Sequence, residues 1–233
     1  MKIFYLFFVC MLAVCSAAYS QNIDILRKSD TFGRKEKHRE FIYWNNPADT
    51  AGLEYIATLS SKASAMGGKG LWELWVFGWN RSNRLGGNVF IFRSYNESDS
   101  IKAELIFDLY LASEEALKRN AELDGKNVVY LFGNKGKAMP VQVNGESVDI
   151  PADSVLRYET PVGSELKLNK GGATGASWKI KGEEAKPALY LSVSGFGLGG
   201  AIPAGTVGLS FSSGRITEMN PNFARLMLAI QKK

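Results

Sequence analysis

Cysteine and histidine are nearly absent from this chain, whose 233 residues include only Cys10, Cys15 and His38. A zinc site needs three or four clustered ligands, and a serine-hydrolase triad needs a histidine beside an orienting carboxylate. His38 lies in a basic segment where neither context is visible, so we expect it to be a surface residue. The sequence therefore predicts no metal site, no cofactor and no identifiable catalytic residue.

A strong excess of charge of one sign is also missing. Lysine and arginine number 28 and aspartate and glutamate 23, which gives a formal net charge of +5 spread over the whole chain. Such a dilute charge does not indicate a nucleic-acid partner. The densest basic stretch, residues 27–39, could face an acidic surface or anionic lipid headgroups, but a charged run of this kind is more often a solvated segment.

Apolar runs long enough to cross a membrane are absent as well. Lys2 precedes thirteen apolar residues, 3–15, and the small residues 16–18 follow them. This layout is typical of a secretory signal peptide, and the run is well short of the roughly 20 residues that span a bilayer. We predict cleavage near Ser20, which removes both cysteines. The mature protein is then expected to be secreted or periplasmic, without a transmembrane helix.

Glycine, in contrast, is plentiful, and many of its 24 copies separate short stretches of alternating polarity. In residues 101–112 most of the apolar side chains fall on one face of a strand and all three charged ones on the other. The dipeptide Asn144-Gly145 is the strongest short signal for a two-residue hairpin. The sequence predicts strands at 53–59, 71–79, 89–95, 101–112, 128–132, 141–143, 148–150, 154–158, 165–168, 177–181, 188–193 and 207–211.

Two segments predict helices instead. Residues 113–123 begin with a serine N-cap and acids in the first turn, and residues 220–231 begin with Asn-Pro and carry apolar residues three and four apart. The pattern predicts a mainly β fold, either an antiparallel β-sandwich or a jelly-roll-like domain with these two helices; a β-barrel is the alternative. We expect a signal peptide at 1–20, a charged, loosely ordered lead-in at 21–50 and a single β-rich domain at 51–233.

Tryptophan is concentrated in one place. Trp72, Trp75 and Trp79 lie within eight residues, and Tyr95 follows one predicted strand later. As a strand, which the flanking glycines favour, the segment puts Trp75 and Trp79 on one face and Trp72 on the other; as a helix it aligns all three. Flat rings pack on sugar C–H groups, while indole N–H and nearby polar groups bond hydroxyls. The predicted ligand-binding residues are Trp72, Trp75, Trp79, Asn80, Arg81 and Tyr95.

Three classes of function remain open. The sequence favours a non-enzymatic secreted or periplasmic binding protein that recognises a glycan or another cell-envelope component through the tryptophan cluster. Segments in which apolar residues alternate with polar or small ones make an outer-membrane β-barrel the alternative. A glycoside hydrolase with a carboxylate pair is the third class, and its candidate acids are Glu73, Asp108, Asp149 and Asp153. The apolar residues on both faces of the predicted strand favour the other interpretation of the tryptophans, as core residues.

Overall fold

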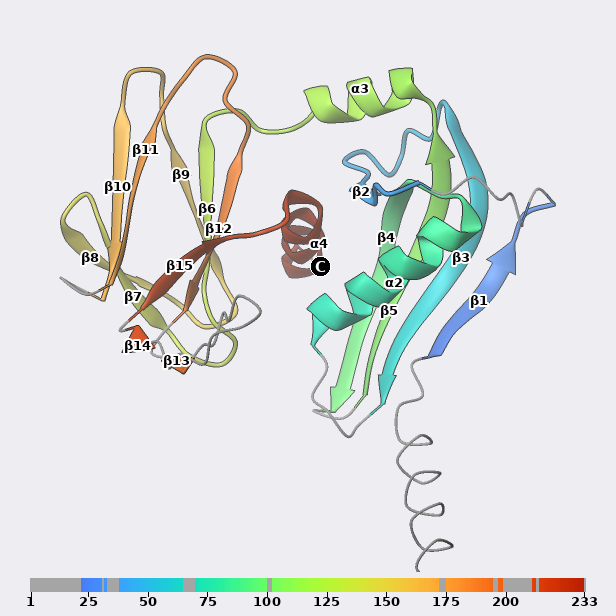
Figure 1. Ribbon diagram of the computed structural model, residues 1–233, viewed down its shortest axis with the longest axis horizontal. Coiled ribbons are helices and arrows are strands. Elements are labelled where there is room, and N and C mark those ends of the chain that lie inside the picture. Colours follow the sequence, from blue (N-terminus) through green and yellow to red (C-terminus); the bar gives the residue numbers. More distant parts are fainter. Residues whose placement is uncertain are drawn as a thin grey trace, which may run out of the picture. The chain divides into compact units, whose positions relative to one another are not determined.

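The computed structural model describes residues 22–30, 32, 38–64, 70–99, 102–171, 175–194, 197–198, 211–212 and 214–232. Contacts within the chain gather in two compact units, unit 1 (Met1–Ala121) and unit 2 (Glu122–Lys233). Figure 1 shows a sheet with helices in unit 1 and smaller sheets in unit 2. The boundary between the units falls inside residues 51–233, for which the sequence predicts one domain.

Unit 1 contains a five-stranded sheet in the order β1-β3-β5-β4-β2, antiparallel except for the parallel pair β2 and β4. Its central strand β5 confirms the strand that alternating polarity predicts at 101–112. The edge strand β1 lies in the segment 21–50, where the sequence predicts a loosely ordered lead-in, and it pairs with β3. The strands are β1 (Asn22–Lys28), β2 (Ile42–Tyr43), β3 (Leu53–Ser64), β4 (Val89–Asp99) and β5 (Lys102–Ala112).

Helix α2 (Leu71–Leu85) lies across one face of this sheet (Figure 1), so the prediction of a strand at 71–79 is wrong. Gly78 favours a strand on sequence grounds, but its role is a close approach: a Cβ at Gly78 would lie 2.7 Å from the Phe107 ring of β5. The Ser61 hydroxyl of β3 also donates to the Leu74 carbonyl at 2.9 Å. The buried residues of the helix recur at helical spacing and are Leu74, Trp75, Gly78, Ser82 and Leu85.

Helix α3 (Glu114–Glu122) confirms the helix predicted at 113–123. The Ser113 Oγ accepts a hydrogen bond from the Ala116 N–H at 3.2 Å, as expected of an N-cap. Ala116 is buried in an apolar cluster with Trp44, Tyr110 and Ala112, among others. The helix therefore covers the end of the sheet where β5 stops.

Unit 2 contains two four-stranded sheets, ordered β11-β10-β7-β8 and β15-β12-β6-β9. Their neighbouring strands are antiparallel apart from the parallel pair β6 and β12. The strands are β6 (Val128–Phe132), β7 (Met139–Val143), β8 (Glu146–Ile150), β9 (Val155–Glu159), β10 (Glu165–Lys170), β11 (Ala176–Lys181), β12 (Leu189–Ser194) and β15 (Arg215–Glu218). A separate pair joins β13 (Gly197–Leu198) to β14 (Phe211–Ser212).

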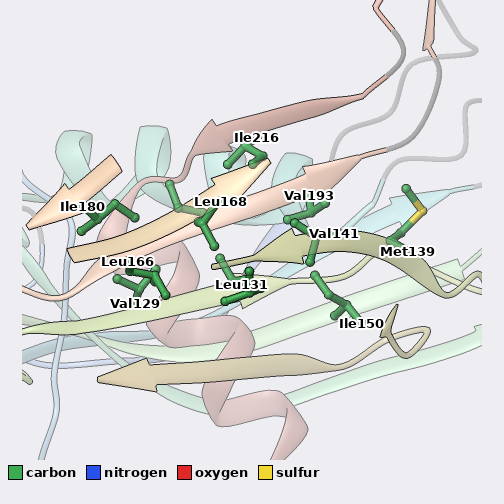
Figure 2. Packing of buried hydrophobic residues seen from close by; sticks show 12 residues of the cluster. Val129, Leu131, Met139, Val141, Ile150, Leu166, Leu168, Ile180, Val193 and Ile216 are labelled. Atoms are coloured by element: carbon green, nitrogen blue, oxygen red, sulfur yellow. The ribbon is translucent and has the colours of Figure 1, made fainter. Parts of the chain in front are cut away.

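A single apolar core joins the two four-stranded sheets of unit 2. Figure 2 shows Val141, Leu168 and Ile180 of one sheet with Leu131 and Val193 of the other in the same cluster. Each of these side chains is buried. Two sheets that share one core form a sandwich, so the mainly β, sandwich-like fold class is confirmed. None of the sheets formed by the described residues closes on itself.

Local signals in unit 2 were read correctly from the sequence. Asn144 and Gly145 join β7 to β8 with φ angles of 52° and 91°, as a two-residue turn with both central residues left-handed requires. Helix α4 (Pro221–Gln231) confirms the predicted C-terminal helix, and the Asn220 side chain accepts from the Asn222 N–H at 2.9 Å. Most of the predicted strand at 207–211 lies outside the described residues.

In the described part of the chain, no helix combines the length and the apolar character that a bilayer crossing requires.

Candidate functional site

The three clustered tryptophans form a row along α2. The ring centroids of Trp72 and Trp75 are 5.1 Å apart, and those of Trp75 and Trp79 are 5.2 Å apart. This is the alignment that the sequence predicts for a helix and not the two-faced arrangement of a strand. The helical spacing of three and four residues therefore explains the row.

The exposure of the row differs from one ring to the next. Trp75 is 1% exposed and packs against Phe41 at 5.8 Å, so it belongs to the core. Trp79 is half-buried, and its indole N–H donates to the Arg39 carbonyl at 3.1 Å. Trp72 is 45% exposed. Among the three, Trp72 is the ring that a ligand can reach most readily.

The other predicted ligand-binding residues lie on α2 and β4. Asn80 is exposed on α2, and Arg81 is half-buried on the same helix. Tyr95 lies on β4, where its hydroxyl donates to Glu97 at 3.1 Å. Burial and, second, this hydrogen bond raise the pKa of Tyr95 to about 12. Tyr95 makes no ring contact with the described tryptophans.

A polar pocket lies on the opposite face of the unit 1 sheet. Side chains alternate along a strand, and Phe107 of β5 meets α2, so the next residue, Asp108, faces away from the helix. The pocket has a volume of about 520 Å³, within the usual range for small-molecule sites. It is lined by Arg27, Tyr55, Thr58, Arg93, Asp108 and Tyr110.

Asp108 forms the floor of this pocket. It lies on the central strand, is 4% exposed and accepts hydrogen bonds at both carboxylate oxygens. The Thr58 hydroxyl donates to Oδ1 at 2.7 Å, and Arg93 donates to Oδ2 through Nε at 2.6 Å and also through Nη2. Because the Thr58 proton is directed at Asp108, the Tyr55 hydroxyl, 2.8 Å away, donates to Thr58. The network is fully hydrogen-bonded at the buried carboxylate.

Arg93 and Tyr110 of the pocket hold their ordinary charge states at neutral pH. The Arg93 pKa is raised, chiefly by its hydrogen bond to Asp108. The Tyr110 pKa is raised as well, first by burial and then by the negative charge of Asp108. At neutral pH the pocket therefore presents a fixed guanidinium and a neutral phenol.

Arg27 supplies a second guanidinium from the edge strand β1. Its Cζ lies over the Tyr55 ring, 5.4 Å from the centroid. Within the described residues no carboxylate forms an ion pair with Arg27. Two guanidinium groups and one carboxylate line the pocket, so its lining carries one net positive charge.

Three β-bulges converge on the pocket. The register shifts between Ile25 and Arg27 in β1, between Tyr55 and Ala57 in β3, and between Phe92 and Ser94 in β4. In each case a lining residue stands at the irregularity: Arg27, Tyr55 or Arg93. Bulges interrupt regular pairing, and they occur often beside functional sites because they redirect a side chain. Here they direct side chains from three strands toward Asp108.

The structure separates two of the proposed catalytic acids, Glu73 and Asp108. Glu73 lies on α2 and Asp108 on the other face of the sheet, so these two cannot flank one glycosidic bond. Asp149 and Asp153 belong to unit 2, where Asp153 accepts from the Gly136 N–H at 3.1 Å. The described residues contain no cluster of three or more acidic, histidine or cysteine side chains that could hold a metal ion.

Of the six lining residues, only Asp108 stands out by itself in the sequence, as a candidate acid on the polar side of its strand, while Arg27 belongs to the basic stretch 27–39. The other five lie on β1, β3, β4 and β5 and carry no shared spacing that would identify them. The signal available was a charged residue in the middle of a long apolar strand, because such a residue must find partners when it is buried.

No protein-family model matches the chain, and no significant match is found among curated proteins or among solved structures.

Proposed function

We propose that the protein is a non-enzymatic binding protein whose ligand is a small hydroxyl-bearing molecule, such as a glycan fragment or another cell-envelope component. The ligand would occupy the pocket lined by Asp108, Arg93 and Tyr55 in unit 1. The predicted signal peptide supports a secreted or periplasmic location, where such ligands occur.

The convergence of three bulges on one pocket is the observation that carries this proposal. A regular sheet would bury or expose Arg27, Tyr55 and Arg93 by simple alternation, without directing them to a common point. Each bulge gives up regular hydrogen bonding, and stability alone does not require three of them in one sheet. Aromatic rings beside arginine donors are also the groups that bind the apolar and polar faces of a sugar.

The pocket favours binding over catalysis. A general acid or base must reach a proton of the substrate, yet both oxygens of Asp108 are already occupied by Thr58 and Arg93. Asp108 is also the one carboxylate among the lining residues. Glycoside hydrolysis uses two carboxyl groups, one as acid and one as nucleophile or base. The geometry therefore suits a fixed recognition site.

A ligand screen on the intact protein tests the proposal. Neutral sugars, acidic sugars and peptidoglycan fragments would be screened by saturation-transfer NMR, and hits measured by calorimetry. We expect a hit whose affinity falls on the order of tenfold in Tyr55→Leu, because the flat ring and hydroxyl are lost. Trp72→Ala should bind as the wild type does. Absence of any binding, with the protein folded by circular dichroism, would refute the proposal.

A second location has one observation in its favour, the 45% exposure of Trp72. An exposed indole next to a buried one can stack on a sugar face. If the ligand binds through the tryptophan row, Trp72→Ala loses the affinity and Tyr55→Leu keeps it. The same pair of variants thus separates the two faces of the sheet.

A further inference from the structure

We infer that the ligand of the pocket carries a carboxylate group and that Arg27 binds this group. The inference rests on the proposed binding function and adds the charge of the ligand and the residue that recognises it.

The charges in the pocket are unequally matched. Arg93 is bonded to the buried Asp108 carboxylate through Nε and Nη2. Arg27 has a ring contact with Tyr55 and no carboxylate partner within the described residues. The one net positive charge of the lining is therefore located on Arg27. A ligand group with a single negative charge matches it, as a carboxylate does at neutral pH.

A chain of contacts fixes the place of Arg27. Its guanidinium lies over Tyr55, whose hydroxyl donates to Thr58, and the Thr58 hydroxyl donates to Asp108. Arg27 is exposed, so its guanidinium N–H donors remain available beside the ring, and a pair of them fits the two oxygens of a carboxylate. The bulge between Ile25 and Arg27 directs the side chain to this face of the sheet.

Lys28 provides a matched control beside Arg27. Its register partner is Ala57, whereas that of Arg27 is Thr58 of the pocket, so the two cations fall on opposite faces of β1. The Lys28 ammonium lies 5.9 Å from the Phe32 ring. Lys28→Gln removes one positive charge from the same strand without touching the pocket lining.

The experiment is calorimetric titration of the intact protein with three probes: glucuronate, glucose and acetate. Glucuronate and glucose share a ring size and differ in the charged group, and acetate has the charge without the ring. We expect glucuronate to bind more tightly than glucose. Arg27→Gln should lower the glucuronate affinity on the order of tenfold and leave that of glucose unchanged, because a charge-assisted hydrogen bond is lost. Lys28→Gln should change neither.

Rising salt gives a second readout, because it screens the attraction between Arg27 and a carboxylate. It should weaken the binding of glucuronate and acetate and leave that of glucose unchanged. Equal affinity for glucose and glucuronate, or an equal loss in Lys28→Gln, would overturn the inference. In either case, loss of sugar binding in Tyr55→Leu would leave the proposed function standing, because the pocket would still be the binding site. Acetate binding as tightly as glucuronate, with loss in Arg27→Gln, would support the carboxylate and refute the glycan. If none of the three probes binds, the inference is overturned. If the wider ligand screen also finds no ligand, the proposed binding function is overturned as well.

Discussion

Removing Arg93 is expected to destabilise unit 1 more than neutralising Asp108 does, although Arg93 is the more exposed partner. The side chain of Arg93 is 57% exposed and that of Asp108 is 5% exposed. Without Arg93, a buried carboxylate keeps only the Thr58 hydroxyl as a partner. Without the charge of Asp108, the guanidinium is left where water can solvate it. Removing Arg93 therefore lowers the free energy of unfolding more than neutralising Asp108 does.

The magnitudes follow from burial. Leaving a fully buried charge without its partner costs about 3–5 kcal/mol, and the access of water past Arg93 puts Arg93→Met at the lower end, about 3 kcal/mol. Asp108→Asn keeps the shape and weakens hydrogen bonds to a charged group, which costs about 1.5 kcal/mol. The double variant leaves no buried charge without a partner and should cost about 2 kcal/mol. The single variants together cost about 4.5 kcal/mol, so the coupling energy between the two sites is about 2.5 kcal/mol.

Urea unfolding followed by tryptophan fluorescence measures these differences. Four of the five tryptophans, Trp44, Trp72, Trp75 and Trp79, belong to unit 1, so the signal reports mainly on the unit that holds the pair. Lys62→Met is a control within unit 1, because it breaks an exposed ion pair with Asp24. We expect little change there, as for most surface pairs.

Two results would refute this reasoning. If Asp108→Asn loses as much unfolding free energy as Arg93→Met, the difference in burial between the two side chains does not determine the stability of the variants. If the double variant costs the sum of the two single variants, the groups are not coupled, and the hydrogen bonds between them contribute nothing to stability.

Three further predictions concern packing, titration and turn geometry. Gly78→Ala should destabilise unit 1 by about 1–2 kcal/mol in urea despite the better helix propensity of alanine, since its Cβ would meet the buried Phe107 ring. Gly70→Ala should be close to neutral, because its Cβ would meet only the Glu73 side chain at 3.5 Å, an ordinary contact. Tyr95 should ionise late in an ultraviolet titration because its pKa is raised to about 12 from 10.0; its contribution to stability is present below pH 10 and is lost as pH rises toward 12, which Tyr95→Phe should abolish. Gly145→Ala should destabilise unit 2 by about 1 kcal/mol, measured by thermal melting followed by circular dichroism. Gly145 has a φ of 91°, and a Cβ added there would meet no atom within 4 Å, so the cost comes from the backbone conformation alone.

Strands and turns were readable from the sequence where one local rule decided the structure. Alternating polarity located β5, and Asn144-Gly145 located the β7–β8 turn. The segment of α2 was ambiguous because its tryptophans satisfy a strand pattern and a helix pattern equally. Gly78 then favoured the wrong choice, since the reason for its small size is the Phe107 ring of another strand, which no local pattern contains.

The pocket could not be predicted for a different reason. Its residues come from four strands, and three of them are placed by bulges that shift the pairing by one residue. A bulge depends on the partner strand, so the sequence of one strand does not contain it. Asp108 alone was visible, as a charge within an apolar strand. Arg93 and Thr58, which neutralise and orient it, lie 15 and 50 residues away in the chain.

The bulge in β1 also bears on whether copies of the protein associate. Within the described residues β1 pairs with β3 alone, so it is an edge strand, and a regular edge strand invites another chain to add to the sheet. The shift at Leu26 breaks the repeat of exposed backbone groups, and Arg27 and Lys28 place positive charge directly beside it. The irregularity that directs Arg27 toward the pocket thereby also protects the sheet against aggregation through this edge.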